Sequence, residues 1–154
     1  MKARSKLLIL AFCAFAAVAS FASDSNLGSW KLNESKSKIP AGASKNTSVV
    51  YTADGDNLKA VVDGVDGSGN PTHSEWTGKF DGKDYPVTGD PRADTRAIKE
   101  VSEHQFELVN KKDGKTTVTG TIVTSADGMT RTLTTHSTSA EGKKVSATFV
   151  YDKQ

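Results

Sequence analysis

Turn signals in which glycine follows an acidic residue recur along most of this chain. They are Asp54-Gly55, Asp66-Gly67, Asp81-Gly82, Asp113-Gly114, Asp127-Gly128 and Glu141-Gly142. Asp-Gly favours tight hairpin loops, because glycine adopts positive φ freely and the aspartate side chain hydrogen-bonds back to the turn backbone. The stretches between the turns are rich in Thr, Val, Tyr and Phe, which suit a pleated sheet. The pattern therefore predicts an all-β fold of short strands joined by hairpins.

Ten such stretches are expected to be strands: Gly28–Asn33, Thr47–Ala53, Leu58–Gly64, Thr72–Phe80, Tyr85–Thr88, Thr95–Val101, Gln105–Lys111, Thr116–Ser125, Thr130–Thr138 and Val145–Asp152. A long meander must protect its two edge strands, and closure into a barrel removes both edges. We therefore predict an antiparallel up-and-down β-barrel of about ten strands. A sandwich is the alternative, although its Cys…Trp…Cys signature is absent and the connections are short. The connection at Glu34–Lys45 contains Pro40 and Gly42 and is expected to be a loop.

The first 22 residues predict a secretory signal peptide. Met1–Lys6 carries three positive charges, Leu7–Val18 is an apolar run, and small residues follow it. This run of 12 residues is too short to cross a hydrocarbon core of about 30 Å. Cleavage is expected after Ala22 or Ala19. Residues 23–154 would then form a single β-barrel domain that is periplasmic or secreted.

Loss of the leader changes the composition of the chain. The only cysteine, Cys13, lies within it, so no disulfide and no thiolate are expected in residues 23–154. The whole chain carries +2, and the leader holds three basic residues and no acid, which leaves −1 for the rest. No basic face remains for nucleic acid, and no integral membrane segment is expected in the mature chain.

Several segments carry a resemblance to known families. Gly28-Ser29-Trp30-Lys31-Leu32-Asn33 looks like the G-x-W entry strand of lipocalin-type barrels. Asp63–His73, Phe80–Gly89 and the ending Val150–Gln154 resemble a family of small exported bacterial proteins with no established activity. The resemblance implies a lipocalin-like barrel, more distantly similar to fatty-acid-binding proteins. In lipocalins the tryptophan closes one end of the barrel and a late arginine packs over it. Here no arginine follows Arg131.

Threonine dominates both faces of the two strands expected at Thr116–Ser125 and Thr130–Thr138. Polar groups therefore accompany whichever face points inward, and a buried hydroxyl without a partner costs roughly 1–3 kcal/mol. Water or a ligand in a cavity would satisfy several hydroxyls at once. The alternative is that these strands are wet and edge-like.

The candidate ligand site centres on Arg131, which shares a strand face with Leu133. An inward arginine needs an anion, and a ligand carboxylate or phosphate fits its fork. Alternatively, Arg131 pairs with an internal acid or projects from the barrel mouth. Arg96, beside Ile98, has a weaker case, and the loop-like segment Tyr85–Asp94 is a second candidate. Four aromatic residues are expected to line either a cavity or an ordinary core: Tyr51, Trp76, Phe80 and Phe149.

No catalytic or metal-binding motif stands out. Asp66-x-Ser68-x-Asn70 has the spacing of half a calcium loop, but Pro71 and Thr77 occupy the positions that need glycine and an acid. The three histidines, His73, His104 and His136, lack zinc spacing. Haem on one axial histidine is the remaining alternative, and no cofactor is expected. No G-x-S-x-G elbow selects a nucleophile, so an enzyme is not expected.

These patterns lead to a functional hypothesis. We expect an exported, non-catalytic protein that binds a small apolar or amphipathic molecule. The alternative is an envelope protein-interaction module whose barrel is packed and has no ligand cavity. The sequence names neither the ligand nor a protein partner.

Overall fold

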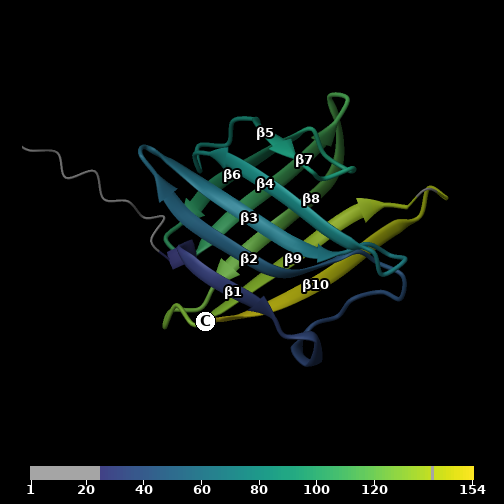
Figure 1. The fold of residues 1–154 in the computed structure, drawn as a ribbon, viewed down its shortest axis with the longest axis horizontal. Helices are drawn as coiled ribbons and strands as arrows, with labels where there is room; N and C mark the ends of the chain where they lie inside the picture. The colour runs from purple at the N-terminus through teal and green to yellow at the C-terminus, as the bar shows by residue number, and fades with distance from the viewer. Residues whose placement is uncertain (1–24, 140) are drawn as a thin grey trace, which may run out of the picture.

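Ten antiparallel strands form a closed barrel in the computed structural model, which describes residues 25–139 and 141–154 (Figure 1). Each strand pairs with the next in the chain, and β10 pairs with β1 to close the ring. The predicted all-β up-and-down barrel is confirmed. The expected leader at residues 1–22 lies outside the described residues. The strands are β1 (Gly28–Leu32), β2 (Lys45–Asp54), β3 (Asn57–Val65), β4 (Pro71–Gly78), β5 (Tyr85–Thr88), β6 (Thr95–Ser102), β7 (Gln105–Lys112), β8 (Lys115–Thr124), β9 (Thr130–Thr138) and β10 (Lys144–Lys153).

The strand β4 ends two residues earlier than the sequence pattern predicts. A Cβ at Gly78 would lie 2.5 Å from the Tyr85 ring and 2.6 Å from the Trp76 ring, so only glycine fits between them. The chain then leaves the sheet and Phe80 packs against the core. The Glu100 backbone N–H donates to the Phe80 carbonyl, which holds this segment against β6.

The connection between β1 and β2 is mostly loop, as its proline and glycine indicate. It contains one short 3-10 helix, η2 (Glu34–Lys36), whose N-cap is Asn33; the Asn33 side chain accepts a hydrogen bond from the Lys36 backbone. Because the strands alternate in direction, the β1–β2, β5–β6 and β9–β10 connections lie at one end of the barrel. We call this the open end. The opposite end, where β1 begins and β10 finishes, is the closed end.

Most of the threonines on β8 and β9 lie on the outside of the barrel. On β8 the inward positions are Val118, Gly120 and Ile122, of which Ile122 is 1% exposed. The alternating positions Thr117, Thr119 and Thr121 therefore face outward. The Thr117 hydroxyl donates to the Arg92 carbonyl at 2.9 Å. Thr124, at the end of β8, is instead 2% exposed, and its hydroxyl has no hydrogen-bond partner among the described residues.

Trp30 of the G-x-W segment lies buried near the closed end. Its indole Nε1 donates to the Asn26 carbonyl at 2.8 Å. The Lys153 ammonium lies 5.3 Å from the centre of the Trp30 ring, a cation–π distance. The last strand therefore supplies a lysine where the lipocalin resemblance implies an arginine.

Candidate ligand-binding site

A cavity of about 400 Å³ occupies the interior of the barrel toward the open end. This volume lies within the range of small-molecule sites, roughly 300–1,000 Å³. Its lining includes every second residue of β9 from Arg131 to Ser137 and continues to Ser139 just beyond the strand, so the cavity runs deep along β9. The loop Pro40–Ser44 contributes to its rim. The described lining residues are Pro40, Ala41, Gly42, Ala43, Ser44, Asn46, Val49, Tyr51, Val62, Arg92, Arg96, Leu108, Asn110, Val118, Arg131, Leu133, Thr135, Ser137, Ser139, Val145, Ala147, Phe149 and Tyr151.

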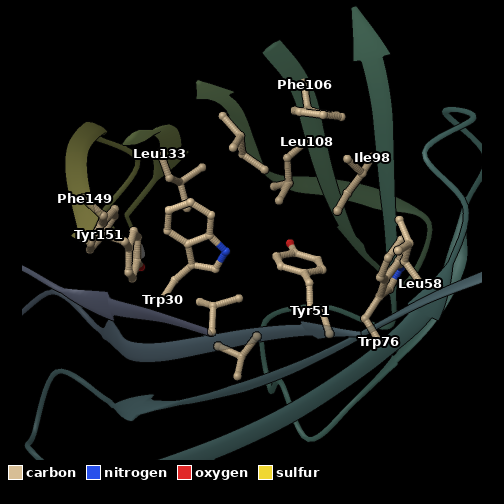
Figure 2. Packing of buried hydrophobic residues seen from close by; sticks show 14 of the residues in the cluster. Trp30, Tyr51, Leu58, Trp76, Ile98, Phe106, Leu108, Leu133, Phe149 and Tyr151 are labelled. Atoms are coloured by element: carbon tan, nitrogen blue, oxygen red, sulfur yellow. The ribbon is translucent and has the colours of Figure 1, made fainter. Parts of the chain in front are cut away.

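The rest of the interior is filled by aromatic rings. We define the aromatic cluster as Trp76, Phe80, Tyr85 and Phe106. Trp76 stacks on Phe80 with ring centres 6.1 Å apart, and the Phe80 and Phe106 rings meet edge-on at 5.0 Å. Figure 2 shows Tyr51 between this side of the interior and the group formed by Leu133, Phe149 and Tyr151.

Arg131 lies at the inner end of the cavity and is 2% exposed. It points inward because it alternates with Thr130 and Thr132 on β9 and shares its face with Leu133. Its Nε donates to Asn26 Oδ1 and its Nη2 to the Tyr51 hydroxyl, both at 3.3 Å. Its guanidinium carbon lies 5.3 Å from the Tyr51 ring centre and 5.6 Å from that of Tyr151.

The contacts of Arg131 satisfy its hydrogen-bonding groups only in part. Both hydrogen bonds go to neutral groups and are long for a charged donor. Within residues 25–139 and 141–154, no ion pair joins Arg131 to a carboxylate. The described residues therefore do not supply Arg131 with the internal acidic partner that the alternative interpretation requires. A buried cation without an anion is costly, so the site favours a negatively charged group.

Arg96 is a second buried cation in the same cavity. Its side chain, 10% exposed, projects from β6; Nε donates to Asn110 Oδ1 at 2.8 Å, and Nη2 lies 3.7 Å from Asp90 Oδ2. Burial lowers the pKa of Arg96; Tyr51 and Asp90 oppose this shift, whereas Arg92 and Arg131 add to it. The two buried arginines therefore repel each other.

Burial also shapes the chemistry of Tyr151 on the cavity wall. It raises the pKa of Tyr151 to about 12, and the positive charge of Arg131 limits the rise. Tyr151 is a neutral phenol at physiological pH. The wall around Arg131 therefore includes an uncharged phenol at Tyr151, and the described lining residues include no carboxylate.

The structure brings together three of the predicted site residues. Tyr51, Phe149 and Arg131 line the cavity. Trp76 is not among the lining residues described; it belongs to the aromatic cluster, and its Nε1 donates to the Arg96 carbonyl at 3.1 Å. The ring packs away from the cavity because Phe80 leaves the sheet and covers it.

Sequence reasoning missed several polar residues of the site. Asn110 follows Phe106 and Leu108 on the inward face of β7, so a polar residue on an apolar face was the available signal. The segment Tyr85–Asp94, singled out from its prolines, contributes Arg92 to the lining. Arg92 Nε lies 3.2 Å from Asp90 Oδ1. No local pattern could have revealed Asn26, which precedes the first strand.

The other candidates from the sequence have local roles. Asp66 accepts hydrogen bonds from the Ser68 and Asn70 backbones at 2.8 and 2.9 Å, so its carboxylate stabilises its own turn. His73 contacts Asp63 on the exposed surface, and His136 contacts Ser146. Among the described residues, no group of three or more His, Cys, Asp or Glu side chains is arranged to hold a metal ion. In the same part of the chain, no helix is both long and apolar enough to span a membrane.

Comparison with solved structures supports the barrel fold. EF1p2_mFAP2b, whose structure was determined bound to DFHBI, is similar over 86% of this chain and 97% of that chain, with a TM-score of 0.52 and 9% identity. Lobster apocrustacyanin A1 is similar over 85% of this chain and 62% of that chain, with a TM-score of 0.44 and 14% identity. Neither the known protein families nor the curated proteins contain a match to this sequence. At these identities, the likeness to the first structure concerns the fold alone.

Proposed function

We propose that this protein is an exported, non-catalytic binding protein that holds a small amphipathic anion in the cavity of its barrel. The observation that carries the proposal is Arg131, which is buried at the inner end of a cavity of about 400 Å³ and has no carboxylate partner among the described residues. The acidic group of a ligand would supply that partner. Apolar wall residues such as Val49, Leu133 and Phe149 would contact its hydrocarbon part.

The lining also supports a role without catalysis. Its described residues include no His, Asp, Glu, Lys or Cys, so the cavity contains no side chain suited to act as a general base at neutral pH. The hydroxyls of Ser137 and Ser139 consequently have no neighbour in the lining that could activate them. The barrel of EF1p2_mFAP2b, determined with DFHBI bound, is an example of a similar fold that holds a small molecule.

The competing hypothesis of an interaction module has less support. It requires a packed barrel, whereas the interior here retains a cavity of about 400 Å³. An interaction surface on the outside of the barrel would not need Arg131 to be buried without an ion pair.

A binding titration tests the proposal. We would titrate the purified protein with a fluorescent fatty acid and repeat the titration with Arg131→Ala. The variant is expected to lose about 1.5–3 kcal/mol of binding free energy, the range for a hydrogen bond to a charged group. Lys99→Gln is the matched control, because it removes a positive charge from the exposed outer face of β6. Its affinity should equal that of the wild type.

A second variant tests the need for space in the cavity independently of the positive charge of Arg131. Ala147→Leu adds a larger side chain to the cavity wall and leaves Arg131 in place, so it should also weaken binding. Circular dichroism of each variant would check that the barrel is folded. If the wild-type protein binds no fatty acid, the proposed function is wrong. If Arg131→Ala binds as tightly as the wild type, the anion is not held by Arg131.

Export is the part of the proposal that rests on the leader. Expression in a bacterial host should give an exported chain that begins at Ser23 or at Ser20, as cleavage after Ala22 or Ala19 requires. The mass of the protein recovered from the periplasm or the medium would show which site is used. A chain that keeps Met1, or carries an acyl group on Cys13, would contradict this part.

A further inference from the structure

Charges around the cavity do not balance. Three arginines line it, Arg92, Arg96 and Arg131, and no carboxylate does among the described residues. Asp90 lies behind the lining, with its side chain 6% exposed. It accepts hydrogen bonds from the Arg92 backbone at 2.9 Å and from Arg92 Nε at 3.2 Å, so Arg92 is its principal partner.

Arg92 and Arg96 share the carboxylate of Asp90, so the three arginines retain two positive charges that no carboxylate among the described residues balances. Arg96 forms a long ion pair with Asp90 at 3.7 Å, and its shorter side-chain contact, at 2.8 Å, is to the neutral amide of Asn110. Arg131 contacts a neutral amide and a phenol. A ligand with a single negative charge would therefore leave net positive charge among these arginines, in a site of low dielectric.

The two arginines reach the same cavity from different strands of the barrel. Arg96 comes from β6 and Arg131 from β9, three strands apart around the ring, and both line the same cavity. Tyr51, from β2, lies with them: its hydroxyl accepts from Arg131. The charge of Arg131 also lowers the pKa of Arg96, in keeping with two guanidinium groups that line one cavity.

We propose that the anionic head group recognised here carries two negative charges, as a phosphate monoester does, and lies between Arg96 and Arg131 beside the Tyr51 hydroxyl. This inference rests on the proposed function and specifies its ligand class. A phosphate dianion offers three acceptor oxygens, enough for both guanidinium forks and the phenol. It removes the repulsion between the arginines, which a monoanion can only reduce.

Three amphiphiles with the same chain test the inference: dodecyl phosphate, dodecyl sulfate and dodecanoate. Sulfate and phosphate heads are both tetrahedral, but the sulfate is a monoanion at every pH used. The phosphate is a dianion at pH 8 and largely a monoanion at pH 5, because its second pKa is about 6. Affinities would be measured by calorimetry, below the micelle concentration of each compound.

The wild-type protein is expected to bind dodecyl phosphate at least about tenfold more tightly than dodecyl sulfate at pH 8, as one additional charge-assisted interaction would give. This preference should disappear at pH 5. Arg96→Gln should abolish the preference at pH 8, because it removes one of the two positive charges: its affinity for the phosphate should fall about tenfold more than its affinity for the sulfate. Lys99→Gln, the control outside the barrel, should behave as the wild type.

Arg96→Lys is a second variant, which tests the same residue if Arg96→Gln does not fold. It keeps the charge and loses the planar fork, so it should retain part of the preference for phosphate. Equal binding of phosphate and sulfate by the wild-type protein at pH 8 would overturn the dianion inference and leave the proposed function standing. Binding of none of the three amphiphiles would overturn both.

Discussion

The two sides of the barrel interior are built from side chains of different size. The aromatic cluster concentrates large rings that contact one another at 5.0 to 6.1 Å. The cavity side presents small inward residues such as Ala147, Thr135 and Ser137, which leave about 400 Å³ unfilled. Three arginines line this space, and two of them, Arg96 and Arg131, are buried. The comparison indicates that stability is concentrated in one region of the interior and the capacity to bind in the other.

The largest expected effect on stability comes from replacing a phenylalanine by alanine, once in the aromatic cluster and once at the cavity wall. Phe106→Ala removes a ring that is 0% exposed and contacts Phe80. It should lower the free energy of unfolding by about 3–5 kcal/mol. Phe149→Ala, at the cavity wall, should cost roughly 1–2 kcal/mol less, because its ring already borders empty space and has fewer packing partners to lose. Urea unfolding followed by circular dichroism measures both. Equal losses would show that the two sides are packed alike.

Glycine substitutions sharpen the same contrast. A methyl group at Gly78 would lie 2.5 Å from the Tyr85 ring and 2.6 Å from the Trp76 ring, so Gly78→Ala should cost about 1–3 kcal/mol through overpacking. Gly120, on β8 toward the cavity side, meets a backbone oxygen at 2.9 Å and a leucine methyl at 3.2 Å. Gly120→Ala should cost less, because the contacts of its added methyl group are longer than those at Gly78. Thermal unfolding of the two variants would rank them. If Gly120→Ala had the lower melting temperature of the two variants, the cavity side would be the more tightly packed side of the interior.

How far the sequence predicted this molecule depends on the range of each interaction. The strands and the inward position of Arg131 follow from local rules, namely the Asp-Gly turns and the alternation with Leu133. The contact between Arg131 and Tyr51 joins residues 80 positions apart, so no local pattern contains it. The place of Trp76 depended on Phe80, which was expected to continue the strand and instead covers the ring. The sequence therefore predicts which residues point inward, but it does not predict which of them pack in the core and which line the cavity.

Alkaline pH tests whether the cavity wall around Tyr151 is shielded from water. The pKa of Tyr151 is raised to about 12 in the folded protein, against an ordinary value of 10.0. Between these values the unfolded chain releases its phenolic proton first. Stability is therefore lost as the pH rises above 10, by about 1.4 kcal/mol per unit in the steepest part.

Tyr151→Phe cannot ionise and should be spared this loss. The difference in unfolding free energy between the variant and the wild type should therefore shift by about 1 kcal/mol in favour of the variant from pH 9 to pH 11. Urea unfolding at pH 9, 10 and 11 measures the difference, and lysine titration is common to both proteins. Parallel pH curves would mean that water reaches the Tyr151 hydroxyl freely, which would contradict a shielded wall.

The smallest expected effect concerns the closed end, beneath both sides of the interior. Lys153 lies 5.3 Å from the centre of the Trp30 ring, and Trp30 is 1% exposed. Lys153→Met keeps an unbranched side chain over the ring and removes its charge, so the loss in unfolding free energy should be about 0.5–1 kcal/mol. Lys153→Arg is the matched control; a guanidinium also stacks on an aromatic face, so this variant should be as stable as the wild type. If Lys153→Met is equally stable, the lysine contributes only its hydrocarbon chain, and closure of this end depends on the burial of Trp30 alone.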